Sequence, residues 1–523
     1  MISVNMNNQL LSDLLNYYNF TEDDYAAFQK LGSINDIPNP FERAASFVNL
    51  IDYIKKAIAE KKKFVIYGDY DVDGITSTTI MVKTLKKLGA KVGYFIPSRY
   101  KEGYGLNSSR IEEFAKKNYD IIIAVDNGIT KVSEVEKAKE LGMETIIIDH
   151  HEAQSKLPDA KFIFQQFLSN YVDYNISAAF LCMLVSFGLL GYYDEYIVTL
   201  AGIAAISDLM PLKNANVALV RMALKNINKY HYKSIMSLVN DKNNVDLHNL
   251  SFEIIPILNS AGRIKQGLEV NDAVKLLLTE DDILIKIYSE KFKEYNQERK
   301  DLVANGFDLA SIDQDKRIII YQSSLPTGIS GLLASRLLSL FDKPVIVYSQ
   351  DPITKNYTAS MRCPKGYNLV TCLENFEDYF VDFGGHSKAA GFTITEKYLD
   401  AFLSKIPDVL ICSSEEEKAK TIKIDINTFN MEDYNLIESF EPFGVEHDRP
   451  LFEINVDKKC LKPSLKNPTH LFYQVNKNLK ICFFNGKKEV EGDGDICLLG
   501  YFNKNTFFKN SLNIDFMVEE AIK

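Results

Sequence analysis

Three short apolar runs, each followed within two residues by an aspartate, constrain the fold of this chain more than any other feature. The runs span residues 64–67, 121–125 and 145–148, and the aspartates that follow them are Asp69, Asp126 and Asp149. Continuously apolar strands that alternate with helical stretches indicate a parallel sheet covered by helices on both faces. Ligands of such sheets bind beyond the carboxyl ends of the strands. We therefore predict an α/β fold whose functional site lies at the edge that collects these acids.

The length of 523 residues corresponds to roughly three to five domains. The long charged stretch 275–305 predicts a helix that is too polar on most faces to be core, and hence a connector. After residue 420 the short strand-like periods and turn signals predict a small closed β-barrel. The predicted division is 1–45 N-terminal lead-in, 46–240 parallel-sheet catalytic domain, 241–305 helical connector, 306–412 second α/β domain, and 413–523 linker and barrel.

Composition excludes several classes of protein. The hydrophobic fraction of 46% and the charged fraction of 25% are ordinary for a soluble globular chain. No apolar run approaches the ~20 residues of a membrane span, and the N-terminus lacks the features of a secretory signal. The seven cysteines are scattered without a CxxC pair, which argues against a disulfide framework and a structural zinc site. We expect a cytoplasmic protein without membrane contact.

The sharpest motif is GDYDVDG at 68–74, which places Asp69, Asp71 and Asp73 at alternate positions. In an extended segment these side chains would point the same way, and like charges so close need a cation. Carboxylate oxygens suit Mg²⁺ or Mn²⁺. An EF-hand loop is one alternative, but 75–82 continue as a helix without an acid at the twelfth position. A solvated acidic turn is the other alternative.

Two further strand ends add Asp126, in VDNG, and the segment Asp149-His150-His151. The histidines could be a structural pair, but beside carboxylates a neutral imidazole is a natural Mn²⁺ ligand. Two hard metal ions bridged by shared carboxylates support an in-line attack on a phosphodiester. The sequence therefore predicts a two-metal phosphoesterase site.

Taken in order, GDYDVDG, VDNG, DHH and ISDLMPL resemble the motifs of the DHH phosphoesterase superfamily. Within it, the chain is similar to the RecJ family of bacterial single-strand-specific exonucleases over roughly residues 45–523. Further matching segments are RYKEGYGLN (99–107), LNSAGRI (258–264), NQERK (296–300), GISGLLASRL (328–337), MRCPKGYNL (361–369), FGGHSKAAGF (383–392) and EPFG (441–444). The resemblance implies a DHH domain, a DHH-associated domain and an OB-fold.

The resemblance also implies roles for individual residues. The implied ligands of two Mn²⁺ or Mg²⁺ ions are Asp71, Asp73, Asp126, His150 and Asp208, with Asp69 as a further ligand. His151 is expected to contact the scissile phosphate or to assist proton transfer. The implied activity is 5′→3′ hydrolysis of single-stranded DNA to 5′-mononucleotides in DNA repair and recombination.

The second domain carries candidate phosphate contacts. A glycine-rich loop supplies backbone amides and cations that favour an anion; its candidate residues are Gly384, Gly385, His386 and Lys388. The alternative is an ordinary turn. Arg263 and Arg362 are candidate bidentate phosphate donors, and their alternative is a salt bridge at a domain interface.

The net charge of −10 hides a basic stretch near the C-terminus. Between residues 458 and 488 there are eight lysines and no acid, interleaved with Phe472, Tyr473, Phe483 and Phe484. OB-folds bind single strands by charge and base stacking, although we expect half of these aromatics to be buried. The implied partners are single-stranded DNA, a helicase, single-strand binding protein, and the recombination and mismatch-repair machinery, and the protein is expected to be a monomer.

Two segments depart from the family pattern. Residues 325–327, Leu-Pro-Thr, stand where a Trp-His pair usually precedes Gly328, and Val445-Glu446-His447 replaces a Gly-Asn. The missing histidine affects substrate handling in the second domain, whereas the metal motifs are complete. The alternatives are a DHH phosphoesterase for oligoribonucleotides or cyclic dinucleotides, and a non-catalytic strand-binding scaffold.

Overall fold

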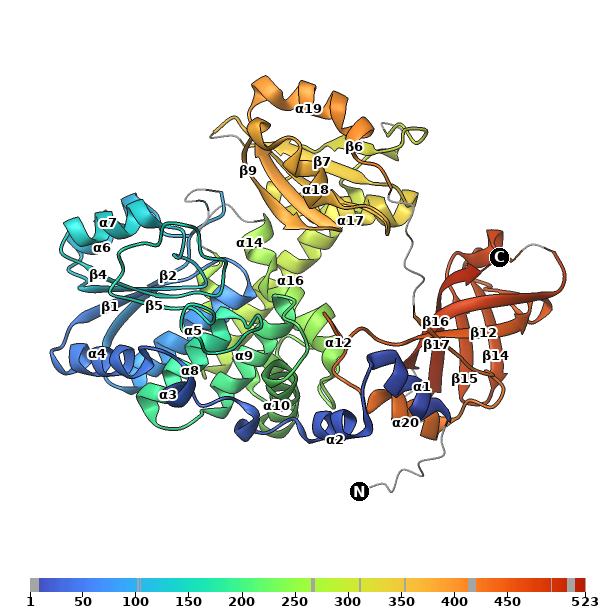
Figure 1. The fold of residues 1–523 in the computed structure, drawn as a ribbon, viewed down its shortest axis with the longest axis horizontal. Helices are drawn as coiled ribbons and strands as arrows, with labels where there is room; N and C mark the ends of the chain where they lie inside the picture. The colour runs from blue at the N-terminus through green and yellow to red at the C-terminus, as the bar shows by residue number, and fades with distance from the viewer. Residues whose placement is uncertain are drawn as a thin grey trace. The chain divides into compact units, whose positions relative to one another are not determined.

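The computed structural model describes residues 9–100, 103, 105–264, 269–309, 312–351, 354–412, 420–490, 492–505 and 513–522. The chain divides into two compact units. The large unit contains residues 37–210 and 219–416, and the small unit contains residues 1–36, 211–218 and 417–523. Figure 1 shows the elements of both units.

A five-stranded parallel sheet forms the centre of the first half of the large unit, in the order β2-β1-β3-β4-β5. The strands are β1 Lys63–Tyr67, β2 Lys91–Phe95, β3 Ile121–Val125, β4 Glu144–Ile148 and β5 Phe162–Phe164. The three predicted apolar strands are β1, β3 and β4, which lie in the middle and are almost wholly buried. The edge strands β2 and β5 were not predicted, because they are only partly buried and carry no long apolar run.

Helices cover both faces of this sheet (Figure 1), as the alternating pattern predicts. The helices of this half are α3 Pro40–Arg43, α4 Phe47–Ala59, α5 Val72–Lys87, α6 Ser108–Lys116, α7 Val132–Glu140, α8 Ala178–Leu190, α9 Glu195–Ser207, α10 Ala215–Tyr230 and α11 Lys233–Met236; residues 215–218 of α10 belong to the small unit. Apolar residues of α6 and α7 pack on one face of the sheet. On the other face lie α5 and α8, both buried on nearly all sides; α8 is almost entirely apolar, whereas α5 also buries several threonines.

A series of shorter helices leads to a long one. They are α12 Leu247–Asn249, η2 Leu250–Ile254, α13 Ile255–Leu258, α14 Ser260–Ile264, α15 Asn271–Leu278 and α16 Asp282–Asn305. The single helix predicted over 275–305 is interrupted at 279–281, because the Asp281 side chain caps a new helix by accepting the backbone N–H groups of Ile283 and Leu284. Only one face of α16 is buried, as its polarity suggested.

A second sheet, in the order β6-β7-β8-β10-β9, completes the large unit. Its elements are β6 Ile319–Gln322, α17 Thr327–Phe341, β7 Val345–Gln350, β8 Tyr357–Arg362, α18 Leu369–Glu374, η4 Glu377–Tyr379, β9 Phe380–His386, β10 Ala389–Ile394 and α19 Glu396–Val409. The glycine-rich segment predicted as a loop is instead the end of β9, which pairs antiparallel with β10 through a turn at Ser387 and Lys388. Gly391 and Gly384 lie opposite each other in this hairpin.

The small unit contains a seven-stranded sheet in the order β11-β12-β16-β17-β15-β14-β13. Its elements are β11 Thr421–Lys423, α20 Met431–Glu438, β12 Leu451–Asp457, η5 Lys458–Cys460, β13 Lys462–Pro463, β14 Leu471–Asn476, β15 Leu479–Phe483, η6 Gly486–Lys488, β16 Asp495–Asn505 and β17 Asn513–Ile522. The predicted barrel is not closed: across the described residues no pairing joins β11 to β13. These end strands have only three and two residues, too few for a closing ladder. The small unit is therefore compatible with the predicted OB-type domain, but its sheet is open.

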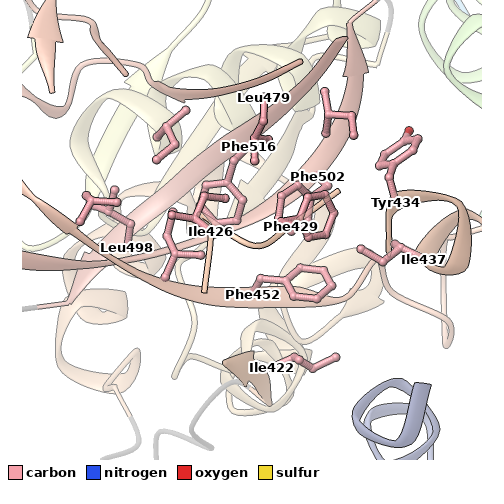
Figure 2. Packing of buried hydrophobic residues seen from close by; sticks show 14 of the residues in the cluster. Ile422, Ile426, Phe429, Tyr434, Ile437, Phe452, Leu479, Leu498, Phe502 and Phe516 are labelled. Atoms are coloured by element: carbon pink, nitrogen blue, oxygen red, sulfur yellow. The ribbon is translucent and has the colours of Figure 1, made fainter. Parts of the chain in front are cut away.

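The core of the small unit also contains the N-terminal helices α1 Gln9–Tyr18 and α2 Glu22–Lys30, which are followed by η1 Ile34–Asp36. Leu10, Leu11 and Leu14 of α1 belong to the same buried cluster as the strand residues drawn in Figure 2, such as Phe452 and Phe502. The N-terminal segment is thus part of this unit.

The departure at 445–447 is explained here. The His447 ring is buried and stacks on Tyr18 at 4.4 Å between ring centroids, and its Nε2 lies 2.8 Å from the carbonyl oxygen of Phe440. His447 therefore packs in the core that joins the chain's two ends.

Across the described residues, no helix combines the length and the apolarity that crossing a bilayer requires.

Candidate active site

The acidic motif at 68–74 connects β1 to α5. Asp69 lies in the turn, Asp71 is the N-cap of α5, and Asp73 lies in its first turn. The carboxylates therefore converge because the chain turns into a helix, and not through the extended alternation that we predicted. Gly74 is required for this turn, since a Cβ there would lie 2.5 Å from backbone atoms of Asp69.

Asp73 is held by a second helix. Its two carboxylate oxygens accept the backbone N–H groups of Ala178 at 2.7 Å and Ala179 at 2.8 Å, at the N-terminus of α8. Orphan N–H groups and the helix dipole both favour an anion at this position. The buried carboxylate is thus fixed in orientation before any ligand binds.

The His150 side chain lies at the centre of the acids. Its Nε2 atom is 3.3 Å from Asp126 Oδ1, 3.2 Å from Asp208 Oδ2 and 3.8 Å from Asp73 Oδ2. Burial, with a contribution from His151, lowers the pKa of His150 to about 4. The imidazole is therefore neutral near pH 7, which is the form that binds a metal ion.

All the predicted ligands meet in three overlapping sets, within each of which the ligand atoms lie within 4.8 Å of one another. The sets are Asp69, Asp71 and Asp126; Asp73, His150 and Asp208; and Asp126, His150 and His151. Asp126 and His150 each belong to two sets. Sharing of this kind is the arrangement that two neighbouring metal ions need.

The electrostatics of the site favour a cation. Burial and then the neighbouring carboxylates raise the pKa of Asp73 to about 7 and that of Asp208 to about 8, and raise those of Asp69 and Asp126 well above their usual range. Within the described residues, Asp69 Oδ1 and His150 Nε2 are buried without a hydrogen-bond partner. Since buried polar atoms are normally paired, this mixed carboxylate and imidazole set fits Mn²⁺ or Mg²⁺.

Asp149 was predicted at this edge of the sheet, but its role, which differs from that of the other acids, was not predicted. Its carboxylate accepts the backbone N–H groups of Ile129, His150 and His151 and contacts His151 Nδ1 at 2.7 Å. Although burial alone would lower it, the pKa of His151 is raised to about 9 by the hydrogen bond to Asp149 and its charge. Asp149 thus orients a protonated His151, whose side chain remains 43% exposed.

Two arginines lie beside the acids. Arg99 follows β2 at the same edge of the sheet, with its guanidinium 4.2 Å from the Tyr70 ring centroid and its Nε buried without a partner in the described structure. Arg263, from α14, has a pKa lowered to about 10 by burial and then by the charges of Arg99 and Arg299. Arg99 was missed, because the partly exposed β2 was not predicted as a strand.

The remaining predicted residues lie in the second half of the large unit. Arg362, at the end of β8, donates from Nη1 to the carbonyl oxygen of Met361, and neither it nor Arg263 forms an ion pair with any described residue. Gly384, Gly385, His386 and Lys388 are exposed on the β9–β10 hairpin. None of the bonds found across the described residues links this hairpin to the acid cluster.

The eight lysines between residues 458 and 488 lie on η5, β13, β15 and η6 and in the loops between them. Most are exposed, and Lys480 lies 4.4 Å from the centroid of the Phe472 ring. Phe483 is buried and Phe484 is 47% exposed, while Phe472 and Tyr473 are half-buried. The side chain of Lys488 lies outside the described residues. We call the remaining seven lysines, together with Phe472 and Phe484, the lysine face.

Comparison with known proteins places this site in a family. The N-terminal domain of the DHH family matches residues 63–201, and the DHHA1 domain matches residues 315–411. The single-stranded-DNA-specific exonuclease RecJ of Bacillus subtilis strain 168 is 31% identical over 457 residues. That match covers 83% of this chain, which spans 57% of the relative's length.

Two solved structures of RecJ proteins have a similar fold. RecJ from Thermus thermophilus in complex with Mn²⁺ has a TM-score of 0.76 at 20% identity, covering 98% of this chain and 78% of that one. A structure of exonuclease RecJ bound to manganese has a TM-score of 0.58 at 26% identity, covering 70% of this chain and 94% of that one. The chain therefore contains a match to the N-terminal domain of the DHH family followed by a DHHA1 domain, and it closely resembles the RecJ exonucleases.

Proposed function

We propose that this chain is a metal-dependent exonuclease that degrades single-stranded DNA in the 5′→3′ direction and releases 5′-mononucleotides, in DNA repair and recombination. The observation that carries the proposal is the group of three overlapping ligand sets, in which Asp126 and His150 each belong to two sets. The name of the B. subtilis relative, a single-stranded-DNA-specific exonuclease, supports the choice of substrate.

The ligand sets suggest how two ions would be held. Asp69 and Asp71 would hold one ion, Asp73, His150 and Asp208 the other, and Asp126 would contact both. We favour Mn²⁺ or Mg²⁺ from the donor chemistry, and the manganese in the 26% identical RecJ structure supports this choice. Bound metal ions would supply an activated water and stabilise charge on the phosphate oxygens.

The protein groups around the ions complete the mechanism. Protonated His151, oriented by Asp149, would donate a hydrogen bond to the scissile phosphate or a proton to the leaving oxygen. Arg99 and Arg263 would neutralise phosphates next to the acids. Arg362 and the hairpin residues Gly384, Gly385, His386 and Lys388 would hold the phosphate at the 5′ end, which would set the polarity of degradation.

The lysine face would bind the strand beyond the active site. Exposed lysines neutralise phosphates and exposed aromatic rings stack on bases, so neither requires a particular sequence. We also propose that the protein acts as a cytoplasmic monomer beside a helicase and single-strand binding protein. A helicase would supply the unpaired strand that such an enzyme needs.

One assay tests the proposal. Single-stranded DNA labelled at either end, duplex DNA, RNA and a cyclic dinucleotide are compared with Mn²⁺ present. We expect mononucleotides to appear first from the 5′ label of single-stranded DNA, with blunt duplex resistant. Release from the 3′ label first, or preference for the cyclic dinucleotide, would overturn the proposed polarity and substrate and favour a small-substrate DHH phosphoesterase.

A further inference from the structure

The Tyr100 hydroxyl lies where three segments of the large unit meet. It donates a hydrogen bond to the carbonyl oxygen of Arg263 in α14, and it accepts one from the backbone N–H of Gly328 at 3.3 Å in the first turn of α17. Tyr100 itself follows Arg99 at the carboxyl edge of the parallel sheet. One hydroxyl group thus connects the two arginines beside the acids with the second sheet's first helix.

The segment that contains Arg263 also supports the acidic turn. Asn259 Oδ1 accepts the backbone N–H of Val72 at 3.1 Å, between two of the predicted metal ligands. A Cβ at Gly262 would lie 2.6 Å from the carbonyl oxygen of Tyr70, so backbone packs directly on backbone. The segment 259–264 and residues 70–73 are therefore packed together as one unit.

The contact between α14 and α17 is equally close. A Cβ at Gly328 would lie 2.4 Å from the carbonyl oxygen of Arg263 and 2.9 Å from the Tyr100 hydroxyl oxygen. Only glycine fits here without moving one backbone. The first turn of α17, the Arg263 carbonyl and the Tyr100 hydroxyl therefore form one tight contact, with no room for adjustment.

We propose that Tyr100 is a positioning residue, whose hydroxyl fixes the first turn of α17 against α14 and so sets the spacing between the metal-binding acids and the phosphate-binding residues of the second sheet. This inference rests on the proposed function. A strand bound at both places needs that spacing, because the bond to be cut must reach the metal ions while its 5′ phosphate is held. A small phosphodiester that binds only at the acids does not need it.

The test uses Tyr100→Phe, which removes the hydroxyl and keeps the ring. Tyr171→Phe is the matched control, since the hydroxyl of this buried tyrosine also donates to a backbone carbonyl oxygen, that of Pro38, at 2.7 Å. Each full-length variant is assayed with Mn²⁺ on 5′-phosphorylated single-stranded DNA and on bis(4-nitrophenyl) phosphate. Hydrogen–deuterium exchange is measured for peptides that cover residues 258–264 and 326–333.

For Tyr100→Phe we expect kcat/KM on the strand to fall about fivefold, as for the loss of one hydrogen bond, with hydrolysis of the small diester unchanged. The exchange of 326–333 should be faster than in the wild type, and Tyr171→Phe should show neither effect. Gly328→Ala, which pushes α17 away from α14, should show the same pattern more strongly.

Equal losses on both substrates, or equal losses in the control variant, would mean that the hydroxyl only stabilises the fold, and would overturn the inference. Unchanged exchange at 326–333 would overturn it as well. The exchange measurement needs no activity. A wild-type protein that hydrolysed the small diester but not DNA would therefore count against the proposed function, while faster exchange in Tyr100→Phe would still support the contact.

Discussion

Carboxylates at the two edges of the parallel sheet have opposite pKa shifts, because Glu144 at one edge is paired with cations, whereas four of the acids at the other edge are buried close together. At the amino edge, Glu144 begins β4, and its carboxylate accepts hydrogen bonds from Tyr53 and from Lys62 Nζ at 2.7 Å, with Lys161 Nζ 3.5 Å away. Although burial opposes the shift, the hydrogen bonds from Lys62 and Tyr53 lower the pKa of Glu144. This acid is paired within the protein.

At the carboxyl edge, burial and mutual repulsion raise the pKa values of Asp69, Asp73, Asp126 and Asp208. The cations nearby, Arg99 and Arg263, form no ion pair with them among the described residues. The difference shows that this sheet places its acids for two purposes. Paired acids at one edge stabilise the fold, and crowded acids at the other edge cost stability that a bound metal ion would restore.

The largest effect is expected from Asp126→Ala. Because Asp126 belongs to two ligand sets, its loss should reduce hydrolysis of single-stranded DNA at saturating Mn²⁺ to below about one-hundredth of wild type. The free energy of unfolding without metal should not fall much, since the removal of a repelling charge offsets the strain of alanine at a φ of 61°. Turnover and thermal unfolding of the same preparation check both statements. A variant that retained a tenth of the wild-type turnover would contradict the ligand assignment.

Addition of Mn²⁺ should raise the melting temperature through the acids at the carboxyl edge of the sheet. If Mn²⁺ binds only the folded chain, a hundredfold excess over its dissociation constant stabilises by about 2.7 kcal/mol. We expect the melting temperature of the metal-free wild type to rise by several degrees with Mn²⁺, and that of Asp126→Ala to rise much less. An equal rise in both proteins would place the binding elsewhere.

At the amino edge, Glu144→Gln should have the opposite effects to Asp126→Ala: it should lower stability and leave activity unchanged. Loss of the charged hydrogen bonds should lower the free energy of unfolding by about 1 kcal/mol at pH 7, while kcat stays unchanged. The folded-state pKa of Glu144 is lowered, so its contribution is present above the unfolded pKa and is lost as the pH falls through the folded one. Denaturant titrations at pH 7 and below about pH 4 should therefore show the difference shrinking in acid.

The smallest effect is expected on the lysine face, which resembles neither edge because its charges are exposed and spread out. Lys466→Ala should weaken binding to all long single strands alike and reduce the slope of log K against log salt by about 1. Cleavage of a very short oligonucleotide should not change. Fluorescence anisotropy at several salt concentrations measures this, and an unchanged slope would remove Lys466 from the binding surface.

How far the sequence predicts the molecule depends on burial. The strands β1, β3 and β4 are buried on both faces, so their continuous apolar runs predicted them. The positions of these strands then located the acids that follow them. The strand β2 lies at an edge and carries no such run, and Arg99 was therefore missed. Asp208 follows a helix and was identified only through the family resemblance, since its spacing from the other ligands carries no signal.

Other features depend on contacts that no local pattern records. The convergence of Asp69, Asp71 and Asp73 was predicted, but from the wrong geometry, because the chain begins α5 inside the motif. Gly384 and Gly385 pair with β10 in a local hairpin, but glycine is depleted in strands, so these residues did not indicate one. The sheet of the small unit is open because its end strands, β11 and β13, are short and do not pair with each other, and turn signals do not report this.

The small unit has a further consequence, for biosynthesis. Its core needs Leu10, Leu11 and Leu14 of α1 together with strands that the ribosome makes about four hundred residues later. At ~5–20 residues per second, that interval lasts roughly 20–80 s. During this interval the large unit is made, whereas the strands on which the apolar face of α1 packs do not yet exist. We therefore expect the apolar face of α1 to stay exposed on the nascent chain until the last strands are made.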